Sequence, residues 1–156
     1  MADTPLGFLL VDAARLYRAR IDRAFTHAGL GLTAGEARTL AYADLHPGLK
    51  QSALAVKMNV EPMTLVGFLD ALETRGLVAR ETDPKDRRAK IVRLTPAAAP
   101  YLAAVQSAAA VARGDALAGF TADDQAVLRD LLVRIRDTLA RSREESCRDD
   151  GDRDEK

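Results

Sequence analysis

The hydrophobic residues of this chain leave the spacing of a helix at one place only. Up to Gly76, apolar residues recur every three or four positions, which is the period of an amphipathic helix. Residues 77–80 and 90–94 are instead two short apolar runs, separated by the charged segment 81–89 with its Asp83-Pro84 turn signal. From residue 95 the helical spacing returns. The pattern predicts a mostly α fold with one small β-hairpin.

Helix start and stop signals place the boundaries of six helices. Thr33 is followed three residues later by Glu36, which is the spacing of a capping box. Pro62 suits a first helical turn, and Gly76 suits the end of a helix. Thr121 is predicted to cap the last helix. The predicted helices span residues 5–28, 33–45, 50–58, 61–75, 95–118 and 121–142.

Composition excludes several classes of protein. The 23 basic and 23 acidic residues of this 156-residue chain cancel, so it is not a general polycation. Cys147 is the only cysteine, so neither an intrachain disulfide nor a cysteine-based zinc site is expected, and no cofactor is predicted. No apolar run approaches the ~20 residues of a membrane span. The N-terminal residues lack the basic segment of a signal peptide. We therefore expect a cytoplasmic protein.

The order of the central elements is that of a winged helix-turn-helix. Three helices at 33–45, 50–58 and 61–75 precede the hairpin at 77–94. The third helix suits the major groove of DNA, which admits one α-helix, and a cationic hairpin tip suits phosphates or the minor groove. Residues 75–93 hold seven cations and three anions, so positive charge concentrates there despite the zero total.

Three motifs in this block are specific. LDALETRGLVAR at 69–80, DPKDRRAK at 83–90 and LT at 94–95 resemble the MarR family of bacterial regulators, most closely its SlyA-type branch. The resemblance extends over about residues 5–140. It implies a homodimeric transcriptional regulator, such as a repressor, that responds to a ligand. The implied target is a pseudo-palindromic operator in double-stranded DNA, so the protein is expected to be nucleoid-associated.

The resemblance divides the chain into four parts. Residues 1–32 and 95–143 are expected to form the helical dimerisation region, and residues 33–94 the DNA-binding winged lobe. The dimerisation helices have apolar faces that a small winged lobe cannot cover, although an internal bundle without a partner is the alternative. Residues 144–156 are highly charged and are predicted to be disordered.

The resemblance also assigns candidate DNA contacts. Gly67 stands where close SlyA-type relatives have arginine, which indicates either a close backbone approach or a tolerated surface glycine. The wing residues contact DNA or, alternatively, form a solvated charged hairpin. Asp86 is expected to orient one of the two wing guanidinium groups by a bidentate pair. Arg75 is a phosphate contact or complements the end of its helix. The candidates are Pro62, Met63, Thr64, Gly67 and Phe68 on the third helix of the lobe, Asp86, Arg87 and Arg88 on the wing, and Arg38, Lys50, Gln51, Ser52 and Arg75 at phosphates.

A small aromatic carboxylate or phenol is the expected effector. Arg15 and Arg18 occupy positions where relatives place cations against a carboxylate, and Tyr17 is an aromatic neighbour. Surface or interfacial salt bridges are the alternative explanation of the two arginines. Small residues at Gly35, Ala37 and Ala41 predict a pocket that is either roomier than in relatives or closed by other side chains.

The sequence offers little support for an enzyme or for a redox or zinc sensor. No Gly-rich phosphate loop, HExxH, GxSxG or CxxC motif occurs, so an enzyme is not predicted. Acidic neighbours raise the pKa of a thiol, which argues against Cys147 as a redox sensor, and the two histidines have no zinc-site pattern. The remaining alternative is a winged-helix protein-interaction module without specific DNA binding.

Overall fold

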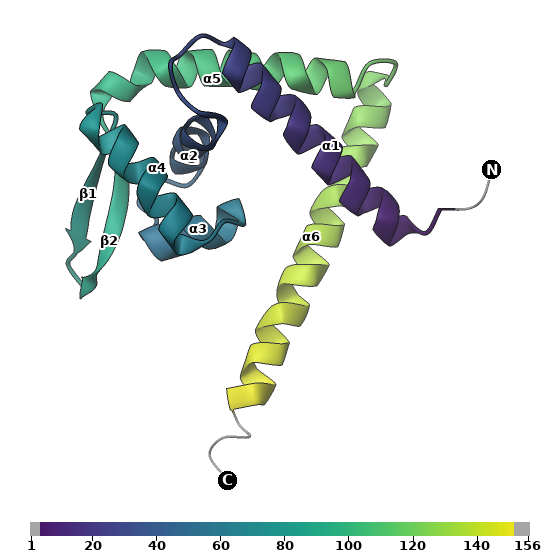
Figure 1. The fold of residues 1–156 in the computed structure, drawn as a ribbon. Coiled ribbons are helices and arrows are strands. Elements are labelled where there is room, and N and C mark those ends of the chain that lie inside the picture. The colour runs from purple at the N-terminus through teal and green to yellow at the C-terminus, as the bar shows by residue number, and fades with distance from the viewer. Residues whose placement is uncertain (1–3, 152–156) are drawn as a thin grey trace. The chain divides into compact units, whose positions relative to one another are not determined.

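The computed structural model describes residues 4–151, with side chains described for residues 4–141. The chain divides into two compact units, Met1–Ala116 and Leu117–Lys156. The structure confirms the predicted fold class, which is mostly helical with one β-hairpin (Figure 1). The first unit contains α1 (Leu6–His27), α2 (Ala34–Leu45), α3 (Gln51–Met58), α4 (Pro62–Thr74), β1 (Val78–Asp83), β2 (Asp86–Leu94), the 3-10 turn η1 (Pro96–Ala98) and α5 (Ala99–Ala116), and the second contains α6 (Ala122–Gly151).

Local signals set the helix ends as expected. The Thr33 hydroxyl accepts a hydrogen bond from the Glu36 amide, and the Glu36 carboxylate accepts one from the Thr33 amide, which completes the capping box of α2. Gly76 has a φ of 70°, a left-handed conformation that glycine adopts without a Cβ penalty. It lets the Leu77 amide reach back to the Leu72 carbonyl at 2.9 Å. The chain thereby turns directly from α4 into the wing.

The core of the winged lobe (residues 33–94) lies between α2, α3, α4 and the hairpin. Leu40, Leu54, Leu65, Leu69 and Leu72 are fully buried there. Full burial of one such side chain contributes about 1.5–3 kcal/mol. The lobe therefore holds α4 in place through its apolar side, which leaves the opposite side of α4 for other contacts.

The hairpin differs from the sequence prediction in its length. The antiparallel strands continue through most of the charged segment 81–89, so only Pro84 and Lys85 form the turn. Cross-strand contacts explain the extension: Arg93 donates to Glu81 at 2.8 Å, and the Lys90 ammonium donates to Thr82 at 2.9 Å. Thr82 and Lys90 are directly opposite each other, and Glu81 and Arg93 are diagonal neighbours; both kinds of pair stabilise a strand pairing.

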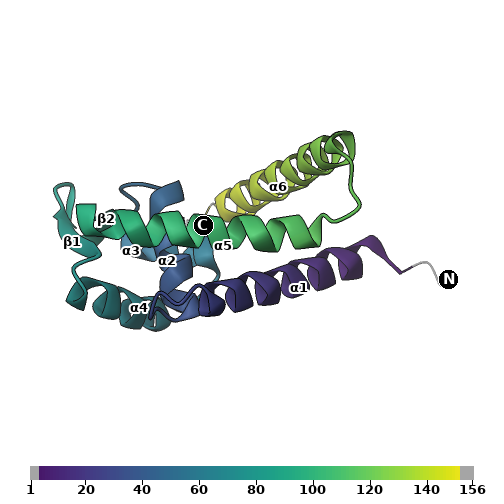
Figure 2. The ribbon, with the colours of Figure 1, turned by 90° about the horizontal axis from the view of Figure 1, so that it is seen from above.

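A second buried cluster joins α1 to α2 and α5. Phe25, Ala37 and Val105 are buried, and Ile21 packs against them. Figure 2 shows α1 and α5 side by side and running in opposite directions. Only the C-terminal half of α1 takes part in this packing. Large apolar side chains of its N-terminal half are exposed, namely Leu6, Phe8, Leu9, Val11, Leu16 and Tyr17.

Helix α6 corrects the predicted end of the ordered chain. Thr121 and Asp124 cap its start reciprocally, as expected from Thr121. The helix then continues to Gly151, past residue 144, where disorder was predicted. Arginine and glutamate are good helix formers, so a helix can continue without an apolar face. Residues 152–156 of the predicted tail lie outside the described residues, as does the side chain of Cys147.

Among the described residues, no helix combines the length and the hydropathy needed to cross a lipid bilayer.

Candidate nucleic-acid interface

Helix α4 has one buried side and one exposed side. Its buried leucines face the core of the lobe, whereas Pro62, Met63, Thr64 and Gly67 are exposed. Met63 is 78% exposed. A Cβ at Gly67 would meet no described atom within 4 Å, so this glycine does not serve close packing against another helix of the described chain. Two explanations of Gly67 remain, namely an approach of DNA to the helix backbone and a tolerated surface glycine.

Phe68 lies elsewhere than the sequence predicted. It is half-buried and packs against the core, with its ring over Gly35 of α2. A Cβ at Gly35 would stand 2.3 Å from that ring. The absence of a side chain at Gly35 therefore provides the space for Phe68. Phe68 serves α2–α4 packing, because a helix residue one position after Gly67 points about 100° away from the exposed side.

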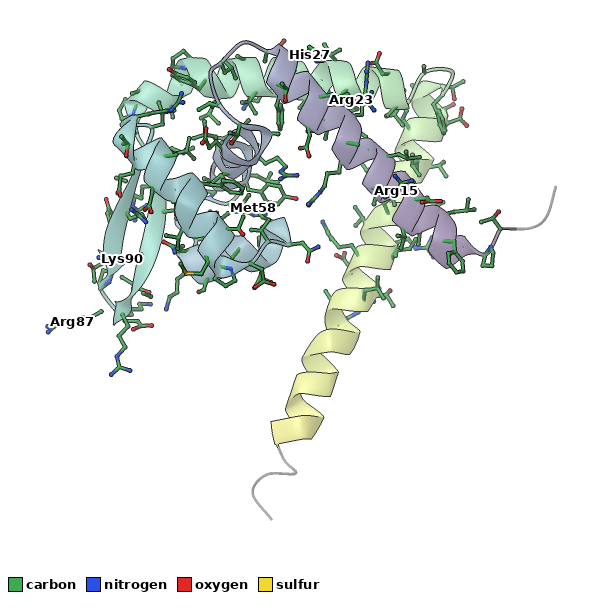
Figure 3. All side chains as sticks on the ribbon, viewed as in Figure 1. Arg15, Arg23, His27, Met58, Arg87 and Lys90 are labelled. Carbon is green, nitrogen blue, oxygen red and sulfur yellow. The ribbon has the colours of Figure 1, made fainter. Side chains whose placement is uncertain are left out.

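The wing presents its two arginines to solvent. Arg87 and Arg88 are exposed, and in Figure 3 the Arg87 side chain projects away from the hairpin. Asp86 was expected to orient a guanidinium. Its Oδ1 instead accepts the backbone amide of Arg88 at 3.1 Å, so Asp86 shapes the backbone of the turn. The arginine side chains make no ion pair with any residue whose side chain is described.

Lys50 was predicted to contact a phosphate, but its ammonium group lies beside two carboxylates of the wing. Its Nζ lies 3.0 Å from Oδ2 of Asp83 and 3.6 Å from Oδ2 of Asp86. The hydrogen bond to Asp83 raises the pKa of Lys50. The pKa of Asp83 is lowered, first by the hydrogen bond from the Lys85 amide and then by Lys50. Lys50 is therefore engaged with the wing.

The start of α3 borders a surface depression of about 330 Å³. Gln51 and Ser52 line one side, and the wing lines the other through Asp86, Arg88, Ala89 and Lys90. The N-cap residue of α3 makes no side-chain capping bond, so the first amides of the helix receive no bond from its cap. Helix amides and cations of this kind suit the phosphate backbone of a duplex.

The remaining predicted phosphate contacts, Arg38 and Arg75, lie beside other parts of the chain. Arg38 donates to Asp22 of α1 at 3.1 Å and is half-buried, which ties α2 to α1. Arg75 is exposed at the C-terminal end of α4, and a Cβ at Gly31 would lie 3.7 Å from its Nη1. It therefore borders the loop before α2, away from the N-terminal half of α4.

Sequence reasoning missed the role of Arg80. Its Nη2 lies 2.5 Å from Oε2 of Glu73 and 2.6 Å from Oδ1 of Asp70, both on α4. The hydrogen bond from Arg80 lowers the pKa of Glu73. Strand β1 is thereby tied to α4, and two carboxylates of α4 are neutralised. Asp70, Glu73 and Arg80 all belong to the 69–80 motif, so the signal was present in the sequence.

The predicted effector residues differ in their contacts and burial. Arg15 lies 3.3 Å from Asp12, and Arg18 donates to the Met58 carbonyl at the end of α3 at 3.2 Å. Arg15 and Met58 are marked in Figure 3. Ala37 is fully buried, so it cannot line an open pocket. Ala41 and the exposed Tyr17 complete the predicted set. Of the two alternatives for this region, Phe68 over Gly35 corresponds to closure by another side chain.

A separate depression of about 430 Å³ lies between α1 and α5. It is lined by Arg20, Arg23, Ala24, His27, Ala28, Ala104, Ser107, Ala108, Val111 and Asp115, which include none of the predicted effector residues. No group of three or more His, Cys, Asp or Glu side chains suits a metal ion within the part of the chain that the structure describes.

Comparison with known proteins identifies the fold. The MarR family model matches residues 32–90. A MarR-family transcriptional regulator from Rhodococcus sp. RHA1 is 28% identical over 85% of this chain and 96% of its own, with a TM-score of 0.72. A probable transcriptional regulator from Pseudomonas aeruginosa is 31% identical over 86% of this chain and 99% of its own, with a TM-score of 0.66.

A third solved structure shares the fold. It is BpsR of Bordetella bronchiseptica, whose DNA binding is regulated by 6-hydroxynicotinic acid. It is 21% identical over 88% of this chain and 96% of its own, with a TM-score of 0.69. These matches do not separate the SlyA-type branch from the rest of the family. Together with the motifs at 69–95 and the winged lobe that they build, they show that the chain belongs to the MarR family of transcriptional regulators.

Proposed function

We propose that the chain is a homodimeric transcriptional regulator that binds a pseudo-palindromic operator. In each protomer, the exposed side of α4 enters the major groove and the wing contacts the flanking backbone or minor groove. The observation that carries this proposal is the placement of the wing tip and the N-terminal ends of α3 and α4. They lie on the same side of the winged lobe, which is the lower side in Figure 1.

The charges of the winged lobe support a duplex as the partner. Asp70 and Glu73 on α4 are paired with Arg80. Asp83 and Asp86 on the wing are paired with Lys50. The exposed cations of Arg87 and Arg88 have no such carboxylate partner among the described side chains. This arrangement favours local contacts with phosphates in a chain whose net charge is zero.

Exposed apolar faces support a second copy of the chain as a partner. The N-terminal half of α1 exposes Leu6, Phe8, Leu9, Val11 and Leu16, and α6 exposes Val127, Leu131, Leu132 and Leu139. Contiguous apolar surface of this kind marks an interaction site. We propose that these faces form the dimer interface, because regulators of the MarR family act as dimers.

We further propose that a small aromatic acid releases the DNA. BpsR is regulated by such an acid, and Arg15 and Arg18 of this chain offer guanidinium groups on α1. The acid would compete with Asp12 for Arg15 and with the Met58 carbonyl for Arg18. A ligand shifts the conformation only by its differential affinity for the two states.

The DNA-binding proposal is tested with duplexes selected from a random-sequence pool. Arg87→Ala with Arg88→Ala is expected to weaken binding in a mobility-shift assay and to lower the slope of log affinity against log salt by about 0.9 for each lost phosphate contact. The double variant Arg129→Ala with Arg134→Ala removes two cations of α6 and is the charge-matched control, with affinity unchanged. A chain that selects no duplex contradicts the proposal and favours the protein-interaction module.

The ligand proposal is tested on the same complex by titration with 6-hydroxynicotinic acid and a panel of phenolic acids. Release of the duplex by the parent, and weaker release from Arg15→Ala or Arg18→Ala, is expected. An acid panel that neither binds the protein nor releases the duplex contradicts this part of the proposal.

A further inference from the structure

The contacts of Lys50 set it apart from the other cations of the winged lobe. It is the N-cap residue of α3, and its backbone forms a bridge with Ile91 of β2. The adjacent Leu49 carbonyl accepts the Val92 amide at 3.0 Å. The segment before α3 is therefore hydrogen-bonded to the wing through its backbone, directly next to the Lys50 side chain.

The two carboxylates held by Lys50 each shape the wing turn. The other oxygen of Asp83 accepts the Lys85 amide at 2.8 Å, and the other oxygen of Asp86 accepts the Arg88 amide at 3.1 Å. Asp83 is buried, with its side chain 8% exposed. A buried carboxylate without a cation is costly, so Lys50 stabilises this arrangement of the turn.

We propose that Lys50 is a positioning residue for DNA binding, which acts through Asp83 and Asp86 on the wing and not by contact with a phosphate. This inference rests on the proposed function for its effect on DNA affinity. Lys50 fixes the turn from which Arg87 and Arg88 project, and it neutralises two carboxylates that would otherwise repel the duplex. The wing arginines make the contacts, and Lys50 determines where they stand.

The first test measures the wing in the free protein, without DNA. Lys50→Met keeps most of the apolar stem and removes the charge. Amide hydrogen exchange, followed by NMR, is expected to become faster at Lys85 and Arg88, whose amides donate to the two carboxylates. Lys57→Met removes a cation from the same helix, one without an ion pair among the described side chains, and is expected to leave both amides unchanged. Unchanged exchange in Lys50→Met overturns the proposal.

The second test is a double-mutant cycle on the selected duplex. In the parent, Lys50→Met is expected to weaken binding about tenfold, because two wing carboxylates lose their cation beside the DNA. In a chain that carries Asp83→Asn and Asp86→Asn, the same change is expected to have less than about a twofold effect. The asparagines retain Oδ1 as the acceptor for the Lys85 and Arg88 amides, and circular dichroism verifies that each variant folds.

The cycle separates the two roles of Lys50. A phosphate contact predicts the same loss of affinity in both backgrounds and a fall of the salt slope by about 0.9. Equal loss in both backgrounds, or no loss in either, overturns the positioning role. Failure of the parent to bind any duplex contradicts the proposed function alone, since the hydrogen-exchange result does not depend on DNA.

Discussion

The two halves of α1 both place apolar residues at helical spacing, but these residues have different surroundings. In the C-terminal half, Ile21 and Phe25 pack against α2 and α5. In the N-terminal half, Leu9 and Leu16 have the same helical spacing, yet they are exposed to solvent. The winged lobe resembles the C-terminal half of α1, because Leu65, Leu69 and Leu72 of α4 are fully buried.

The difference shows that periodicity identifies an apolar face and does not identify its partner. The winged lobe and the C-terminal half of α1 bury their faces within one chain. The N-terminal half of α1 and the helix α6 expose apolar side chains, and we propose that the second protomer covers them. Variants in the two kinds of region should therefore affect different quantities: folding stability in the lobe, and self-association at α1.

The largest expected effect is the loss of a core side chain in the lobe. Leu69→Ala should lower the free energy of unfolding by about 2–5 kcal/mol, because Leu69 is fully buried and the change leaves a cavity. Met63→Ala, on the exposed side of the same helix, should change stability by less than about 0.5 kcal/mol. Denaturant unfolding measures both. Equal effects would show that α4 is not packed as described.

The α1 face should respond in self-association. Leu9 is 52% exposed, and its burial in a dimer contributes about 1.5–3 kcal/mol, so Leu9→Asn should raise the dimer dissociation constant tenfold or more. Leu45 is 71% exposed and lies outside the face, so Leu45→Asn is the matched control. Sedimentation equilibrium measures the constant. A Leu9→Asn chain that remains dimeric would place the interface elsewhere.

The contact between Gly35 and Phe68 allows a paired test within the lobe. Gly35→Ala should destabilise the chain by about 1–3 kcal/mol, because the new methyl group overlaps the Phe68 ring. Phe68→Leu in the Gly35→Ala background should recover part of this loss by opening space. Thermal unfolding of the four chains in the cycle measures the coupling. Additive effects would contradict direct contact.

The smallest expected effect is a gain in folding stability, whereas the other stability changes are losses. Gly67→Ala should stabilise the chain by up to about 1 kcal/mol, because alanine is the better helix former and its Cβ meets no described atom. The affinity for the selected duplex distinguishes the two explanations of this glycine. Weaker binding by the more stable variant indicates close approach of DNA to the helix backbone, and unchanged binding indicates a surface glycine.

Much of the fold was predictable because the signals are local. The Thr33–Glu36 capping box, Pro62 and Gly76 each act within a few residues, so the helix boundaries follow from short segments of sequence. The strands were predicted too short, because Glu81 and Thr82 are held by partners on the other strand. The end of α6 was also misplaced, since low hydrophobicity alone does not exclude a helix of arginine and glutamate.

The candidate site was predicted in composition but only partly in geometry. Arg87 and Arg88 are exposed on the wing, where the motif placed them. Lys50 and Phe68 are the exceptions. A cation near the start of a helix predicts a phosphate contact, and only the fold brings two wing carboxylates to it. The family resemblance made Phe68 a candidate for DNA contact, and only the fold brings its ring against Gly35 of α2.

The sequence by itself determined the helices, the single hairpin, the family and the concentration of positive charge at residues 75–93, because periodicity, capping residues and contiguous motifs act over short separations. Only the tertiary structure decided which apolar faces are covered, which carboxylate each cation meets and which candidate residues remain free for DNA. The physical reason is that Lys50 with Asp83 and Gly35 with Phe68 are contacts between elements far apart in the sequence, which form by packing and leave no local pattern.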